Sequence, residues 1–374
     1  MVLSIKQVIL TSVLSVLAFA VQAQTQKVEV LEYHPAPGQF VNTLPAADEN
    51  STQDDVNQGC EEQLSGDGLV HLGTYGGYIT VKFDHPIENK PGSDILILGN
   101  GFYSNADPIY GKETIGGSIE PGIVYVGVGK NLEEAKWYEL AGSEYYTSEI
   151  HDFQITYYKP TAESGDYTQF SSSYDKYIKW ECSWTDKNGE HRDSTGYHMK
   201  NVSHKQTYWP IWEGKDELTF KGGKLPNNAI ETSGKGTYWI QYRYAKDAYG
   251  YVDASPATDS LYSSFDINWA VDDEGNQVVL DHIDFIRVKT GIFQYCGWLG
   301  ETSTEINSIA DLHLIEGYDD KPFVITPRQR PTTGITRPTI HVVEDDVYYN
   351  LMGQRVLNLV KGHIYVHKGR KVIY

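Results

Sequence analysis

The pattern that most constrains the fold of this chain is a succession of short apolar runs, each ended by glycine, proline or asparagine. Some runs alternate polar and apolar side chains, as in a strand with one buried face, and others are continuously apolar, as in a strand buried on both faces. The clearest runs lie at residues 76–83, 94–99, 122–129, 239–244 and 265–272. Such a series favours an all-β protein.

Helical periodicity is scarce, and the best candidate helices, residues 54–64 and 131–135, are short. No segment repeats at a fixed period, which argues against a propeller or a solenoid. The run at 265–272 is expected to pair with residues 278–288 across a turn at 273–276. Many short strands separated by turns predict a β-sandwich of jelly-roll type.

Composition narrows the functional classes. The chain has 374 residues, 40% of them hydrophobic and 13% aromatic, which is enough to form a real core and excludes global disorder. Its formal net charge of −19 argues against a sequence-independent nucleic-acid binder, which needs a cationic surface against phosphate. The same charge argues against docking on anionic lipid.

The first 23 residues have the features of a secretory signal peptide. Lys6 precedes an apolar stretch at residues 8–21, and Ala23 ends a small-residue cleavage site. The alternative is a membrane helix, but the stretch is shorter than the roughly 20 residues that a span needs. The residue directly after the cleavage site is not a cysteine, and the first cysteine of the chain is Cys60. A lipid anchor is therefore not expected. We expect an exported protein without a transmembrane segment.

The C-terminal end forms a separate unit. Residues 326–340 are rich in proline, threonine and arginine, which predicts an extended linker after a binding domain at residues 24–325. Residues 341–374 contain short β-patterned runs separated by glycine turns. Their pattern resembles the C-terminal sorting tails of secreted Bacteroidetes proteins that use type IX secretion, which implies export across the outer membrane. The alternative is an ordinary β-hairpin that ends the domain.

The motifs of common enzymes are absent from the sequence. There is no nucleophile elbow, zinc-protease motif or phosphate-binding loop. Residues 99–101 read Gly-Asn-Gly but lack the third glycine and the following helix of a dinucleotide site. We therefore expect a binding protein and not an enzyme, with no required cofactor. A glycosidase acid–base pair remains an alternative, since carboxylates are abundant.

The three cysteines, Cys60, Cys182 and Cys296, are widely spaced, and none belongs to a Cys-x-x-Cys pair. One disulfide with one free thiol is compatible with an exported protein. Three buried thiols that act as small apolar residues are equally compatible with the sequence.

One acidic segment suggests a metal site. Asp266, Asn268 and Asp272 have even spacing, so they would share one face of a strand over residues 265–272. Their oxygens could bind Ca²⁺. The alternative is the polar outer face of a half-exposed strand, opposite the apolar side chains of the same run.

Residues 150–250 form an aromatic-rich region that is predicted to be inserted in the sandwich. It holds five of the eight tryptophans. Tyr208, Trp209, Trp212 and Tyr251 are the candidate ligand contacts, because tyrosine and tryptophan give large contact areas at low entropic cost. The alternative is that these rings fill the core, as large rings usually do.

Several phrases resemble the BtuH-type surface cobalamin-binding proteins of gut Bacteroidetes. They lie at residues 33–42, 72–79, 120–124, 137–145, 225–228, 266–272 and 296–305. The resemblance implies that the protein captures cobalamin or a related corrinoid at the cell surface, as partner of an outer-membrane transporter. The chain departs from the family in lacking the lipoprotein cysteine. The competing class is a glycan-binding or adhesion β-sandwich, since fold alone does not decide between ligands.

Overall fold

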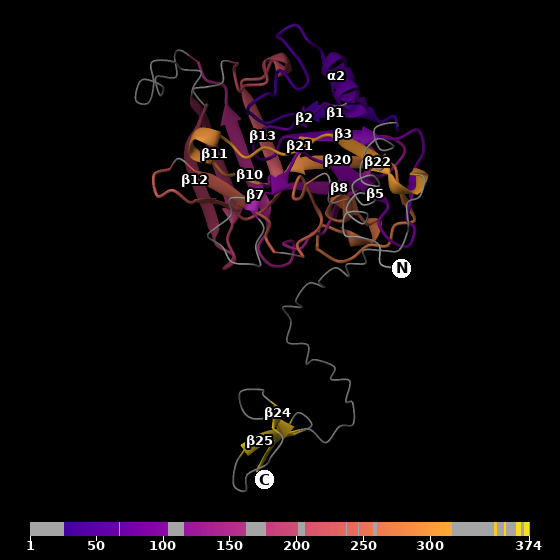
Figure 1. Cartoon of the computed structure of the whole chain (residues 1–374), viewed down its shortest axis with the longest axis vertical. Helices are drawn as coiled ribbons and strands as arrows, with labels where there is room; N and C mark the ends of the chain where they lie inside the picture. The colour runs from indigo at the N-terminus through magenta and orange to yellow at the C-terminus, as the bar shows by residue number, and fades with distance from the viewer. Residues whose placement is uncertain are drawn as a thin grey trace, which may run out of the picture. The chain divides into compact units, whose positions relative to one another are not determined.

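The computed structural model describes residues 26–103 except 67, 116–161, 177–200, 206–256 except 237 and 246, 260–315, and four short strands near the C-terminus (Figure 1). The chain divides into two compact units, Met1–Arg330 and Pro331–Tyr374. The expected signal peptide at 1–23 and linker at 326–340 lie outside the described residues. No helix in the described ranges has the length and apolar character needed to cross a membrane.

The principal sheet of the first unit is antiparallel and joins strands from both ends of its sequence. In spatial order it contains β1 (Glu29–His34), β3 (Tyr78–Lys82), β20 (Phe285–Thr290), β8 (Gly122–Val128), β9 (Lys136–Leu140) and β18 (Ala270–Val271), and β16 (Tyr251–Val252) also pairs with β8. β20 lies between β3 and β8, where Val288 pairs with both Ile79 and Val124. These three side chains are fully buried, so the centre of this sheet carries the main core.

A second antiparallel sheet is formed by the aromatic-rich region. Its order is β12 (His191–Met199), β11 (Tyr177–Thr185), β10 (Ile150–Tyr158) and β13 (Glu217–Lys224), and Figure 1 shows these strands beside the principal sheet. Its own buried cluster is rich in rings, in which Tyr75 packs edge-on against Phe153 and Tyr157 packs edge-on against Phe220. The expected aromatic region is therefore a separate sheet with a separate core.

Smaller antiparallel sheets connect distant segments. They are β14 (Ala229–Glu231), β15 (Trp239–Tyr242), β7 (Gly116–Ser118) and β6 (Phe102–Tyr103); β17 (Ser264–Phe265), β5 (Ile95–Leu98) and β22 (Ser308–Asp311); β19 (His282–Ile283) with β4 (Ile87–Glu88); and β2 (Val70–His71) with β21 (Glu305–Ile306). Short 3-10 turns join them: η4 (Ile211–Glu213), η5 (Ser260–Ser263), η6 (Ile267–Trp269), η7 (Gly297–Leu299) and η8 (Leu312–Leu314). The prediction of an all-β, sandwich-like fold is confirmed.

The one α-helix of the described residues, α2 (Gln53–Ser65), confirms the helix expected at 54–64. Thr52 and Asp55 form a reciprocal capping box that satisfies the first backbone N–H groups. Val56, Cys60 and Leu64 recur every four residues and bury one face of the helix. Residues 131–135, the other expected helix, form turns instead.

The expected strand at 265–272 is interrupted. β17 ends at Phe265, the turn η6 follows, and β18 begins at Ala270. Two carboxylates hold this turn: Asp266, within the run, caps η6, and the buried Asp94 accepts a hydrogen bond from the Ile267 backbone N–H at 2.9 Å. The expected pairing is correct only beside the turn, where Val278 donates to the Ala270 carbonyl. β20 pairs with β3 and β8, and not with the 265–272 run.

The second unit contains a small antiparallel sheet. Its order is β24 (Arg355–Val356), β23 (Tyr348–Tyr349), β25 (Ile364–His367) and β26 (Arg370–Ile373). These strands coincide with the β-patterned runs of the tail. Within the described ranges, they pair only with one another.

Ending the chain after Ile315 is expected to leave the melting temperature of the first unit unchanged. Ile315 itself must stay, because it is buried in a cluster with Leu96 and Leu98. Differential scanning calorimetry of the shortened and full chains checks this. A fall of several degrees would mean that the removed residues belong to the core of the first unit.

Candidate functional site

The four aromatic residues predicted to contact ligand are core residues. The exposed fractions of Tyr208, Trp209, Trp212 and Tyr251 are 0%, 2%, 9% and 2%. Tyr208 and Trp209 belong to the ring-rich cluster of the second sheet, whereas Trp212 packs in the main core and Tyr251 in a third cluster. Because they share no surface and have no free ring face, the structure replaces the ligand-contact interpretation with the core alternative.

Trp209 and Tyr251 make hydrogen bonds within the protein, and Trp212 makes a ring contact. The indole N–H of Trp209 donates to the carbonyl of Lys215 at 3.1 Å, and the Tyr251 hydroxyl accepts from the Glu144 backbone N–H at 2.8 Å. Trp212 stacks on Tyr33 with ring centroids 6.0 Å apart. These contacts hold loops on the two sheets together.

The predicted calcium ligands do not share a strand face either. Asp266 is buried and caps η6 by accepting from the Asn268 N–H at 2.8 Å, and desolvation by burial raises its pKa to about 6. The Asn268 amide exchanges two hydrogen bonds with Asn89, at 3.0 and 3.1 Å. Asp272 caps the exposed turn that follows, accepting from the Asn276 N–H at 2.8 Å. The shared strand face on which the calcium prediction rested does not form, because Asp266 and Asn268 lie at the turn η6 and Asp272 follows β18.

All three cysteines are free thiols and are buried. Burial raises the pKa of Cys60 and the pKa of Cys182, and it raises the pKa of Cys296 to about 12. The interpretation as small buried residues therefore holds, and the alternative disulfide does not form.

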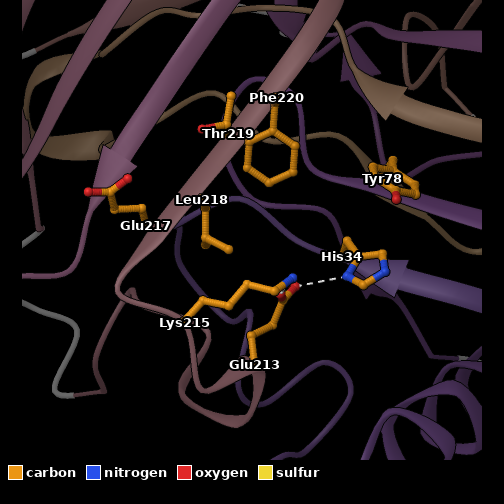
Figure 2. Close-up of a pocket in the computed structure, with 8 residues that line it drawn as sticks. All are labelled: His34, Tyr78, Glu213, Lys215, Glu217, Leu218, Thr219 and Phe220. Carbon is orange, nitrogen blue, oxygen red and sulfur yellow. Dashed lines mark hydrogen bonds and ion pairs between the residues drawn. The ribbon is translucent and has the colours of Figure 1, made fainter.

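One cavity, of about 160 Å³, lies beside Trp212 between β1 and β13 (Figure 2). Figure 2 shows the Glu213 carboxylate between two basic side chains, with the His34 Nδ1 at 3.0 Å and the Lys215 ammonium at 2.6 Å. Burial alone would raise the pKa of Glu213, but these two hydrogen bonds lower it overall. The negative charge of Glu213 is therefore already compensated by these two basic side chains.

A second cavity, of about 230 Å³, is lined by acidic and other polar groups. We call it the acidic cavity. Its lining residues are Gln39, Phe40, His71, Asn100, Ser118, Glu120, Gln241, Cys296, Leu299, Glu301, Ser303 and Glu305. None of them is lysine or arginine, so the cavity holds three glutamates without a strongly basic partner.

Three carboxylates meet at the edge of this cavity, which Glu120 and Glu305 line and which Asp253 adjoins through them. One oxygen each from Glu120, Asp253 and Glu305 lies within 4.8 Å of the other two. Glu120 precedes β8, Asp253 directly follows β16, and Glu305 begins β21. Because β16 pairs with β8, and the Glu305 backbone N–H donates to Asp253 at 3.1 Å, the fold brings these distant residues together.

A chain of hydrogen bonds orients the carboxylates. The Nε2 of His71 lies 2.6 Å from Glu305, and its Nδ1 lies 2.9 Å from the Ser303 hydroxyl. The Ser303 backbone N–H donates to Glu120 at 3.1 Å, as does the amide of Gln241. Both ring nitrogens of His71 are therefore engaged, and desolvation lowers the pKa of this imidazole despite the nearby carboxylates.

The backbone around Asp253 is unusual. Asp253 has a φ of 57°, and Phe40, which also lines the cavity, has a φ of 61°. These are the non-glycine residues with positive φ among those described, and such conformations gather at functional sites. Residues Gly99 and Gly101 make room for Asp253: a Cβ at Gly99 would lie 2.3 Å from its Oδ1. The N–H groups of Asn100 and Gly101 donate to that oxygen.

It is unfavourable for all three of these carboxyl groups to be ionised at the same time. Desolvation, followed by repulsion from the neighbouring carboxylates, raises the pKa of Glu120 and of Asp253 well above the ordinary values. Desolvation also raises the pKa of Glu305 to about 8. Glu301 differs, because the imidazole of His198, 3.6 Å away, and the backbone N–H of Gln39 outweigh desolvation and lower its pKa. Groups so strongly perturbed in a cavity mark a candidate functional site.

Sequence reasoning missed this site because its members are far apart in the chain. Glu120 and Ser303 are separated by 183 residues, and Asp253 and Glu305 by 52. The Gly-Asn-Gly motif at 99–101 is visible in the sequence, but its backbone N–H groups bind the Asp253 carboxylate and not a nucleotide. No protein-family model matches the sequence, and no curated protein is similar to it.

Proposed function

We propose that this chain is an exported binding protein at the cell surface, that its ligand site is the acidic cavity, and that its ligand is a corrinoid such as cobalamin. The observation that carries the proposal is the density of hydrogen-bonding groups in one strained cavity. Amides of Gln39, Asn100 and Gln241 lie there with carboxylates and hydroxyls. The amide arms of a corrinoid offer matching donors and acceptors.

The size of the cavity sets how such a ligand would bind. A cavity of about 230 Å³ is below the 300–1,000 Å³ that encloses drug-sized ligands, so it would take one amide arm while the ring stays outside.

An exposed ring stands beside the cavity. Phe102 on β6 pairs with Ser118 on β7, and paired residues of antiparallel strands point to the same face. Ser118 lines the cavity, and the side chain of Phe102 is 58% exposed. An exposed phenylalanine at this position offers a flat apolar surface for the edge of the corrin ring.

Phe102→Ala is expected to weaken cyanocobalamin binding about tenfold or more, since an aromatic contact at a binding centre is often a hot spot. The measurement is isothermal titration calorimetry with cyanocobalamin, run beside a panel of glycans. Val279→Ala is the matched control, because Val279 is 81% exposed and does not line the cavity.

No cyanocobalamin binding by the wild type would contradict the ligand. Equal affinities of wild type and Phe102→Ala would contradict this placement of the ring. Turnover of a glycan by the purified chain would contradict a purely binding role.

Glycan binding is the second candidate, favoured by a separate surface. A groove of about 390 Å³ on the second sheet is lined by hydroxyls and carboxylates, including Thr156, Ser183, Asp193 and Thr195. Hydroxyl-rich ligands suit such a surface. Glycan binding that survives Phe102→Ala would favour this groove over the acidic cavity.

A further inference from the structure

We propose that the acidic cavity holds a divalent cation, with Ca²⁺ the expected ion, bound by the carboxylates of Glu120, Asp253 and Glu305. The inference goes beyond the proposed function and does not depend on which organic ligand the protein takes. Cation binding would use only side chains of this chain and water.

The spacing of the three carboxylates suits a single ion. Calcium binds oxygens at about 2.3–2.6 Å, so two oxygens on one ion lie at most about 5.2 Å apart. The oxygens from Glu120, Asp253 and Glu305 lie within 4.8 Å of one another. All three can therefore reach a common centre without a change in the backbone.

An unsatisfied oxygen marks that centre. Glu305 is 5% exposed and lines the cavity, and its Oε2 is buried without a hydrogen-bond partner. Its other oxygen contacts His71, and Asp253 receives three backbone N–H groups. Because leaving a buried acceptor unsatisfied is costly, Glu305 Oε2 indicates a missing electropositive partner.

The charge balance indicates the same partner. Among the residues that line the cavity there is no lysine or arginine, although Glu120, Glu301 and Glu305 are all present. The first cavity is the contrast, because Glu213 there has the ammonium of Lys215 as well as the imidazole of His34 within ion-pair distance, whereas Glu305 has the imidazole of His71 and no ammonium. A divalent cation would compensate the acidic cavity as those side chains compensate Glu213.

The donor atoms select the ion. The three candidate ligands offer oxygen only, and His71 has both ring nitrogens engaged, which disfavours zinc. Magnesium demands a nearly ideal octahedron at about 2.0–2.1 Å, whereas calcium accepts six to eight oxygens in irregular arrangements. Water in the cavity of about 230 Å³ can supply the ligands that the carboxylates do not.

The test is a calcium titration of the full chain after removal of metals with EDTA, followed by calorimetry. We expect about one Ca²⁺ per chain and a higher melting temperature in Ca²⁺ than in EDTA, since an ion that binds the native state stabilises it. Glu305→Gln should weaken Ca²⁺ binding at least tenfold. The control is Asp272→Asn, a half-buried acid after β18 that does not line the cavity, which should bind as the wild type does.

Absence of Ca²⁺ binding by the stripped wild type would overturn the proposal, as would a Glu305→Gln variant that binds Ca²⁺ with unchanged affinity. Glu120→Gln serves the same purpose if Glu305→Gln does not fold. A cyanocobalamin titration in EDTA and in Ca²⁺ keeps the two proposals separate. Calcium binding without cobalamin binding would contradict only the proposed function, and cobalamin binding without calcium binding would contradict only the cation site.

Discussion

Trp209→Ala is expected to lower the free energy of unfolding by about 3–5 kcal/mol, as truncation of a buried tryptophan usually does. Trp209 is 2% exposed and packs in the ring-rich core of the second sheet. The change would also leave the Lys215 carbonyl without the indole donor that lies 3.1 Å away. Urea unfolding followed by circular dichroism measures the loss.

The matched control is Tyr238→Ala, since Tyr238 is 45% exposed and its removal should change stability by about 0.5 kcal/mol or less. Ligand affinity, measured on the fraction of Trp209→Ala that stays folded, should equal that of the wild type. A specific loss of affinity with little loss of stability would restore Trp209 as a ligand contact.

Lys289→Met is expected to cost about 3–5 kcal/mol, the usual effect of removing one partner from buried charges. Lys289 is 5% exposed, and its ammonium donates to the Gly223 carbonyl at 3.1 Å. It interacts electrostatically with Glu139 and Glu149, whose side chains have buried oxygens without hydrogen-bond partners. Removing the ammonium therefore leaves the two buried carboxylates without the positive charge that stabilises them.

The stability that Lys289→Met loses should depend on pH in one direction. Desolvation raises the pKa of Glu149 well above its ordinary value, and loss of Lys289 would raise it further. A carboxyl whose pKa is raised by folding stabilises the protein below its unfolded pKa and loses that contribution as the pH rises. The deficit of Lys289→Met should therefore be larger at pH 8 than at pH 5.

Two further variants isolate the cause. Lys289→Met with Glu149→Gln should recover much of the lost stability at pH 8, because one buried charge is removed. Lys221→Met, a change of an exposed lysine on β13, should have an effect of about 0.5 kcal/mol or less. A deficit of Lys289→Met that does not change with pH would show that packing, and not charge, is lost.

The local sequence pattern was sufficient to predict much of the secondary structure. The alternation at 76–83 and the apolar runs at 94–99 and 122–129 correspond to β3, β5 and β8. The helix α2 follows from its capping residues and apolar spacing, both of which are local. The turn η6 was not predicted in this way, because one of the two carboxylates that hold it, Asp94, is distant in sequence and close only after folding.

The candidate site was beyond the reach of local pattern for the same reason. Residues 120–124 are one of the phrases that carry the family resemblance, but no spacing of polar residues there marks Glu120 as a ligand. Its role depends on Asp253 and Glu305, which approach it only when the strands pair. Asp266 and Asp272 lie close together in sequence and gave the stronger local signal for a metal site. Each carboxylate, however, caps its own turn.

The pairing of early with late strands determines when the first unit can fold. Arg287 on β20 and Thr80 on β3 are hydrogen-bonded at a sequence separation of 207, and Gln26 and Asp311 at a separation of 285. A chain made from its N-terminus therefore lacks the centre of its main sheet until almost the whole unit has been synthesised. Closing such long loops is slow. The nascent protein should remain unfolded, and open to chaperones, until β20, β21 and β22 have emerged.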